Sequence, residues 1–247
     1  MRRLRTVNVD LPAESGHHKG LAYTLWLPPA RPAAGTQRPA AGGVVILHGA
    51  GSSKESHYDF ARMVVGAGLA AICFDQRGHG ESEGALDARA GQDVAAMAEL
   101  LRERLDSADA PVVFRGSSMG GYLAIASAEL GRAAAVVAIC PAPAELLRAG
   151  LRRGALEFDA DPAGLDAFLA EHDLDAAASG LTVPVLLLHA EGDERVPVEH
   201  SRELAKQLGS PDSRLVVVPG GHHRSVQHDR ELQAVSLRFI ERALAGG

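Results

Sequence analysis

The strongest indication of the fold is the segment "PVVFRGSSMGGYLAIASAEL", residues 111–130. An apolar run is followed at once by a G-x-S-x-G pattern centred on Ser118, and then by a segment of helical composition. In this pattern a strand turns sharply into a helix, and the serine lies on the strained turn with its hydroxyl exposed. Gly116 and Gly120 leave room where strand and helix approach. We therefore interpret Ser118 as a nucleophile rather than part of a Gly-Ser turn, and Ser117 as its neighbour.

Working outward, the same alternation of apolar runs and helical segments fills most of the chain. Further apolar runs occupy residues 44–48, 69–75, 135–142, 183–190 and 214–220. Helix-like segments occupy residues 54–65, 87–105, 119–130, 198–208 and 227–244. Strands that are apolar on both faces are typical of a parallel sheet buried between helices. The pattern predicts an α/β fold with helices on both faces of the sheet, and functional residues at the carboxyl ends of the strands.

The N-terminal region has a different pattern. Residues 3–11 and 21–28 alternate between apolar and polar side chains, with "PAESGHHKG" between them, which predicts a hairpin with a turn at 12–20. Residues 28–43 are rich in Pro, Ala and Gly and are interpreted as a surface connector. The whole chain, 1–247, is thus expected to form a single domain.

Composition excludes several classes of protein. The net charge of −6 argues against nucleic-acid binding, and no stretch is apolar and long enough to span a membrane. The start of the chain has no apolar signal core, so we expect a cytoplasmic protein with no membrane partner. Cys73 and Cys140 both lie in apolar runs and are expected to be buried free thiols.

A serine nucleophile needs a base and an acid that orients the base. Asp193, in "EGDERVP", follows the apolar run at 183–190, and two histidines follow the run at 214–220. The order serine, acid, histidine is the one expected for an α/β-hydrolase. Taken alone, Asp193 would be read as a turn residue, and Glu191 and Glu194 are alternative acids whose positions fit less well.

Two adjacent histidines, His222 and His223 in "GGHHRS", compete for the role of the base. Neighbouring side chains on an extended loop point in opposite directions, so only one of them can face the serine. A Gly-His junction favours His222, whereas the register counted from Gly220 favours His223. We choose His223 and keep His222 as the alternative.

The loop after the first buried run, "HGAGSSKES", is made of small residues and can offer a backbone N–H to an oxyanion. We predict an oxyanion hole formed by the N–H groups of Ala50 and Met119. His48 is interpreted as structural, packing under this loop. The polar residues of "DQRGHGES" are interpreted as scaffold: Asp75, Arg77 and His79.

Together, "HGAGSSKES", "DQRGHGES", "GSSMGG", "EGDERVP" and "GGHH" resemble the α/β-hydrolase superfamily, in particular its branch of small serine esterases, acylglycerol lipases and aminopeptidase-like enzymes. These motifs span most of the chain from residue 44 onward. The resemblance implies an eight-stranded, mostly parallel sheet with a cap inserted after the sixth strand, and a hairpin plus six buried runs agrees with that number. The cap is expected at 143–181.

The short cap suggests an open site with a small or extended substrate. Its larger apolar residues are candidates for an acyl pocket, although packing of the cap onto the body is the favoured interpretation for most of them: Leu146, Leu147, Leu151, Leu156, Phe158 and Phe168. No metal and no cofactor are expected, because the histidine pairs lack metal-site spacing and neither a P-loop nor a dinucleotide fingerprint occurs.

The motifs therefore predict a serine hydrolase that cleaves a small-molecule carboxylic ester through an acyl-enzyme. Thioesterase and peptidase or amidase activity are alternatives, since fold and triad do not set the leaving group. A non-catalytic binding protein on the same fold is the alternative of another class. The serine, acid and histidine positions argue against it.

Overall fold

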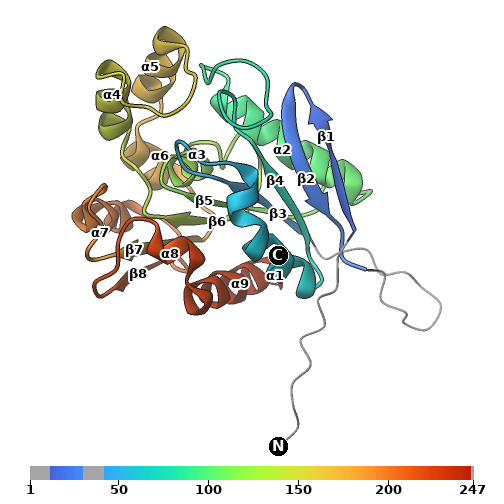
Figure 1. Ribbon diagram of the computed structural model, residues 1–247. Helices are drawn as coiled ribbons and strands as arrows, with labels where there is room; N and C mark the ends of the chain where they lie inside the picture. Colours follow the sequence, from blue (N-terminus) through green and yellow to red (C-terminus); the bar gives the residue numbers. More distant parts are fainter. Residues whose placement is uncertain (1–11, 30–41, 246–247) are drawn as a thin grey trace, which may run out of the picture.

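The computed structural model describes residues 12–29 and 42–245. An eight-stranded sheet with the strand order β1-β2-β4-β3-β5-β6-β7-β8 runs through the molecule (Figure 1). β1 and β2 are antiparallel to their neighbours, and the other pairs are parallel. The strands are β1 (Ala13–His18), β2 (Leu21–Trp26), β3 (Gly43–Leu47), β4 (Ala70–Phe74), β5 (Val112–Ser117), β6 (Ala133–Ile139), β7 (Val185–Ala190) and β8 (Arg214–Val218).

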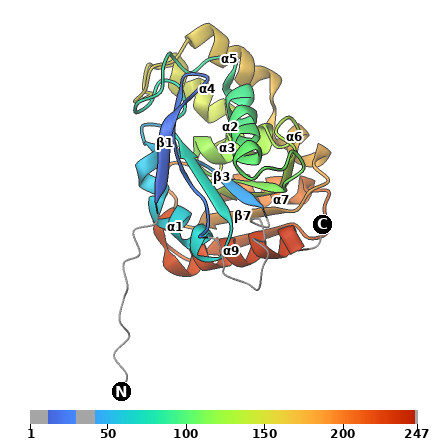
Figure 2. The same ribbon diagram turned by 90° about the vertical axis from the view of Figure 1, so that its right-hand side faces the viewer.

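Helices cover both faces of this sheet, as expected. The segments are η1 (Lys54–His57), α1 (Tyr58–Gly66), α2 (Ala90–Arg104), α3 (Met119–Ala126), α4 (Ala144–Arg152), α5 (Pro162–Glu171), α6 (Leu174–Gly180), α7 (Val198–Gln207), α8 (Ser225–His228) and α9 (Arg230–Ala245). One apolar core contains residues of α2, α3, α6 and α7, and the other contains residues of α1 and α9. Figure 2 shows α2 and α3 on one side of the sheet and α9 on the other.

Strand residues alternate between the two cores. Val45 and Leu47 of β3 belong to the first, whereas Val44 and Ile46 belong to the second. This double burial explains why the central strands appear in the sequence as continuous apolar runs. The α/β-hydrolase fold predicted from the sequence is confirmed, and the six central strands begin and end within three residues of the predicted runs.

The N-terminal hairpin differs from the prediction. The segment expected to be the turn contains β1 itself, which pairs with β2 from Ala13 opposite Trp26 to His18 opposite Leu21. The turn is only Lys19 and Gly20, both with positive φ (52° and 80°). Such a tight two-residue turn matches the twist of paired strands, so no longer connection is needed. The expected strand at 3–11 lies outside the described residues.

Three helices, α4, α5 and α6, lie between β6 and β7, where a cap was expected after the sixth strand. α4 and α5 pack against each other, and Figure 1 shows them beyond the end of the sheet. α6 contacts α3 and α7 of the body instead. The insertion is therefore anchored on the main domain at its C-terminal end. Within the described ranges, none of the helices has the length and apolar composition needed to cross a membrane.

Candidate active site

Ser118 lies on the sharp turn between β5 and α3, with φ 54° and ψ −118°. Positive φ is costly for a non-glycine residue, so the surrounding structure must hold this conformation. The Ser118 N–H donates to the Ile139 carbonyl (2.8 Å), and the Ser118 carbonyl accepts from Ala142 N–H (3.2 Å). Both bonds tie the turn to the end of β6.

Two glycines make this turn possible. A Cβ on Gly116 would overlap the carbonyl of Gly120, and a Cβ on Gly120 would lie 2.5 Å from the carbonyl oxygens of Leu47 and His48. The strand, the helix and the end of β3 thus meet at van der Waals distance only because these side chains are missing. Both glycines have the role that the sequence predicted.

The structure brings His223 and Asp193 together from two different loops. Nδ1 of His223 lies 2.7 Å from Oδ2 of Asp193, and both side chains are buried. His222 is exposed, and its backbone N–H bonds the Ser225 hydroxyl (2.9 Å) instead. The geometry thus favours the register that was chosen from the sequence.

The carboxylate of Asp193 is surrounded by hydrogen-bond donors. Its Oδ1 accepts from the backbone N–H groups of Arg195 (2.8 Å) and Val196 (2.9 Å). Its Oδ2 is approached by His223 and by Nε2 of His189, which lies 3.3 Å away. Burial opposes ionisation, but the hydrogen bonds from His189, His223 and the backbone outweigh it and hold the pKa of Asp193 far below its ordinary value. Asp193 is therefore a carboxylate at neutral pH.

The two alternative acids have other partners. Glu191 is exposed and lies 3.2 Å from Arg202, measured between Oε1 and Nη2. Oε2 of Glu194 accepts from the backbone N–H of His223 (3.0 Å), so Glu194 binds the backbone of the histidine loop rather than the imidazole. Asp193 alone of the three hydrogen-bonds a ring nitrogen of His223.

Sequence reasoning missed two side chains at this site, His189 and Cys140. Sγ of Cys140, a carboxylate oxygen of Asp193 and a nitrogen of His223 lie within 4.8 Å of one another. Such a sulfur, oxygen and nitrogen set resembles a zinc site, but zinc needs a thiolate. Burial raises the pKa of the Cys140 thiol well above its ordinary value, and Asp193 occupies Nδ1 of His223. We describe the set as a hydrogen-bonded cluster. Both cysteines are buried free thiols, as expected.

The loop after β3 lies directly beside the nucleophile turn. A Cβ on Gly49 would be 3.3 Å from Cβ of Ser118. Among the described residues, the N–H groups of Ala50 and Met119 donate to no protein acceptor, which a donor of an oxyanion hole requires. Met119 is the first residue of α3, where the helix dipole adds positive potential. These are the two groups predicted for the oxyanion hole.

Polar residues under this loop form the scaffold. The His48 ring is buried and bonds the Gly49 carbonyl through Nδ1 (2.8 Å), while its Nε2 accepts from Gln76 N–H (3.0 Å). Nζ of Lys54 donates to Asp75 (2.7 Å), and Nε of Arg77 donates to Asp93 (2.8 Å). These contacts agree with the interpretation of His48, Asp75 and Arg77 as structural.

In this conformation the predicted hydrogen bond between Ser118 and His223 is not formed. No hydrogen bond joins Oγ of Ser118 to His223 or to any other side chain in the described residues. Catalytic hydrogen bonds are often long in ligand-free enzymes and tighten when substrate binds. The structure thus brings together the acid and the base at hydrogen-bond distance, and presents the serine on an adjoining turn.

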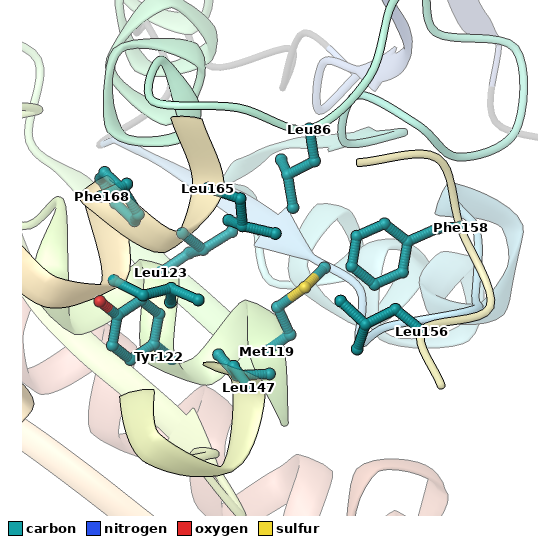
Figure 3. Close-up of a pocket in the computed structure, with 10 residues that line it drawn as sticks. Leu86, Met119, Tyr122, Leu123, Leu147, Leu156, Phe158, Leu165 and Phe168 are labelled. Atoms are coloured by element: carbon teal, nitrogen blue, oxygen red, sulfur yellow. The ribbon is translucent and has the colours of Figure 1, made fainter. Parts of the chain in front are cut away.

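An apolar pocket adjoins the nucleophile turn through Met119 (Figure 3). Its walls come from the body and from the inserted helices: Leu86, Met119, Tyr122, Leu123, Leu147, Leu156, Phe158, Leu165, Phe168 and Leu169. Of the predicted pocket candidates, four line it, while Leu146 and Leu151 only pack against the core. The cavity volume is about 10 Å³, close to the size of one water molecule.

Comparison with known proteins agrees with this geometry. The pattern of the family described as "Serine aminopeptidase, S33" matches residues 38–157 and 163–231. The monoacylglycerol lipase of Mycolicibacterium smegmatis is 25% identical over 82% of this chain and 85% of its own length. The human monoglyceride lipase is 25% identical over 73% of this chain and 74% of its own.

The fold is shared with solved structures at lower identity. A soluble variant of the monoglyceride lipase of Saccharomyces cerevisiae, crystallised with a substrate analogue, superposes with a TM-score of 0.73 at 16% identity. The match covers 99% of this chain and 98% of the yeast chain. With the family pattern matched over most of its length, this chain belongs to the serine aminopeptidase S33 family of the α/β-hydrolase superfamily, and it is a serine hydrolase.

Proposed function

We propose that this enzyme cleaves carboxylic esters with a triad of Ser118, His223 and Asp193. The observation that carries the proposal is the 2.7 Å bond between Nδ1 of His223 and Oδ2 of Asp193. This bond leaves Nε2 of the imidazole for Ser118, which is the arrangement that a general base requires. His222 is exposed and hydrogen-bonds Ser225 through its backbone N–H, so it is the less favoured candidate for the general base.

In the first half of the reaction, Oγ of Ser118 attacks the ester carbonyl carbon while Nε2 of His223 takes the hydroxyl proton. Asp193 stabilises the imidazolium, and the N–H groups of Ala50 and Met119 stabilise the oxyanion. The tetrahedral intermediate then breaks its bond to the alcohol oxygen, and His223 returns the proton to the leaving alcohol. A water molecule, deprotonated by the same histidine, next attacks the acyl carbon. The bond between this carbon and Oγ of Ser118 then breaks, His223 returns the proton to Oγ, and the carboxylic acid leaves.

The substrate proposed is a small-molecule ester with an apolar acyl group. The pocket beside Met119 has only apolar side chains in its walls, so it suits a hydrocarbon chain rather than a charged one. At about 10 Å³ the pocket has room for no more than the smallest acyl group, and a longer chain requires the inserted helices to move. The lipases named among the relatives support an ester substrate, and we propose that residues 143–181 act as the cap over it. A cytoplasmic location stays a prediction.

The first test of the proposal is labelling by a fluorophosphonate, which reacts with an activated serine. Wild-type protein and Ser117→Ala should label, whereas Ser118→Ala should not. Ser117 is the matched control because it is the buried neighbour on the same turn. No labelling of folded wild-type protein would favour the non-catalytic binding protein instead.

The second test separates the possible leaving groups. Hydrolysis is measured on ester substrates of rising acyl length, on a matched thioester and on a peptide p-nitroanilide. We expect the highest kcat/KM on a short ester. Higher kcat/KM on the thioester or the anilide would support the thioesterase or peptidase alternative, with the same triad.

A further inference from the structure

His189 is a buried histidine at the end of β7, four residues before Asp193. Its side chain and that of Asp193 are both fully inaccessible to solvent. Nothing in the sequence analysis assigned His189 a role. A buried polar side chain in an otherwise apolar strand must have hydrogen-bond partners, and these partners indicate what it does.

The partners fix the tautomer of His189. Nε2 lies 2.9 Å from the carbonyl oxygen of Val196 and 3.3 Å from Oδ2 of Asp193. Both are acceptors, so Nε2 must carry the proton. Nδ1 lies 2.7 Å from the hydroxyl of Ser201 on α7. In the neutral ring Nδ1 has only a lone pair, so Ser201 donates to it. This bond holds the tautomer that points Nε2–H at residues 191–197, the loop that carries Asp193 and is called the acid loop below.

The acid loop is thereby held from two sides. The N–H of Val196 donates to Oδ1 of Asp193, and the carbonyl of the same residue accepts from His189. Nε2–H of His189 also faces Oδ2, the oxygen that binds His223. If this N–H were lost, both the Val196 carbonyl and Oδ2 would lose a buried donor, and the loop could rotate Asp193 away from His223.

We infer that His189 is a positioning residue of the triad, whose tautomer is set by Ser201 and which orients the Asp193 carboxylate toward His223. This inference rests on the proposed function. A chain of side chains therefore runs from α7 through β7 and the acid loop to the histidine loop after β8. Loss of the outer partners of metal-binding histidines typically costs 10- to 100-fold in activity or metal affinity, and we expect an effect of similar size for this partner of the Asp193–His223 pair.

Two amide substitutions test the inference. The amide of His189→Gln can reach the place of Nε2 and keep a donor near Val196 and Asp193, whereas the shorter His189→Asn ends near the place of Nδ1. We expect kcat to fall about 10- to 100-fold in His189→Asn and to be largely rescued in His189→Gln, with KM unchanged in both. A purely structural role would lower stability in both variants without this split.

Ser201→Ala should have a smaller effect on kcat than His189→Asn, because Ser201 acts on Asp193 only through His189. Loss of one hydrogen bond should lower kcat about fivefold by releasing the tautomer. In the double variant with His189→Asn, kcat should be no lower than in His189→Asn alone, because both changes act through one interaction. Fully additive effects would overturn the role of Ser201.

Controls separate the inference from the proposed function. His57→Gln replaces another fully buried histidine, which lies in η1 and contacts Arg115, and should cost stability without changing kcat. Ser118→Ala and Asp193→Asn, assayed together with these variants, report on the triad. If both keep wild-type activity, the proposed function fails. If both lose activity while folded His189→Asn keeps wild-type kcat, the inference about His189 fails.

Discussion

The backbone N–H of Gly51 donates a hydrogen bond of 3.2 Å to Nε2 of His79. Nδ1 of the same ring lies 3.0 Å from the Arg77 carbonyl, so the neutral ring donates there and accepts from Gly51. Its face stacks on Phe158, with ring centroids 4.3 Å apart. His79 thus connects the loop beside Ser118 with the wall of the apolar pocket. The sequence indicated that His79 is a scaffold residue, but it did not show which parts of the molecule His79 connects.

The first prediction concerns this contact. His79→Phe can keep a ring against Phe158 but removes the acceptor of the Gly51 N–H. Because the adjoining Ala50 N–H would then be displaced rather than lost, kcat should fall about tenfold, less than the 10²- to 10³-fold cost of deleting an oxyanion donor. Steady-state kinetics on a short ester checks this. Phe158→Leu, which removes the stack and keeps the bond, should alter KM instead, and an unchanged kcat in His79→Phe would contradict the argument.

The two histidines of "GGHHRS" give the second prediction. His223→Ala removes the base and should lower kcat by about 10⁴-fold or more, whereas His222→Ala should stay within about threefold of wild type. The reason is that His222 is exposed and its bond to Ser225 uses the backbone N–H. Both variants are compared after circular dichroism confirms folding. Loss of turnover in His222→Ala alone would reverse the assignment.

The third prediction concerns acyl length. Leu147 lines the apolar pocket, so Leu147→Ala should extend it and shift the optimum of kcat/KM to acyl chains longer by about two or three carbons. Each buried methylene contributes about 0.8 kcal/mol, close to a fourfold gain in kcat/KM. The preceding Leu146 packs against the core without lining the pocket, which makes Leu146→Ala the matched control. If kcat/KM depends on acyl length in the same way in both variants, the acyl chain does not bind in this pocket.

Stability should depend on pH through His48. Burial lowers the pKa of His48 to about 4, although its partners Gly49 and Asp75 oppose the shift. Since the folded state binds the proton less readily than the unfolded state, the full contribution is present above about pH 6.5 and is lost as pH falls toward 4. The loss from this group is about 3 kcal/mol of unfolding free energy. Burial also lowers the pKa of His57 and His79, so these groups too should lower the unfolding free energy as the pH falls.

Urea unfolding at a series of pH values between 4 and 7 measures this effect. In His48→Gln the decrease in unfolding free energy on acidification should be smaller than in wild type. His17→Gln, at an exposed histidine, serves as the control for the loss of a histidine side chain. An identical slope in wild type and His48→Gln would show that His48 is not the titrating group.

The strands and helices could be predicted from the sequence because each depends on a local pattern. Double burial makes the runs at 44–48 and 183–190 apolar throughout, and the missing side chains of Gly116 and Gly120 are visible in the sequence itself. The hairpin was misplaced because alternation alone does not show where a turn lies. Lys19 and Gly20 turn the chain by their positive φ angles, and a lysine in that conformation gives no sequence signal.

The fold family and the sharp turn at Ser118 could be predicted from patterns within a few residues, and the candidate acid from the order of serine, acid and histidine along the chain. Which of the two histidines lies against Asp193 depends on tertiary contacts. Gly220 and Gly221 both have positive φ (67° and 75°), and their turn directs His223 rather than His222 toward Asp193. The tertiary structure also places His189 and Cys140 beside the Asp193 carboxylate. Contacts between loops thirty or more residues apart depend on how β6, β7 and β8 align in the sheet, and no local pattern records that alignment.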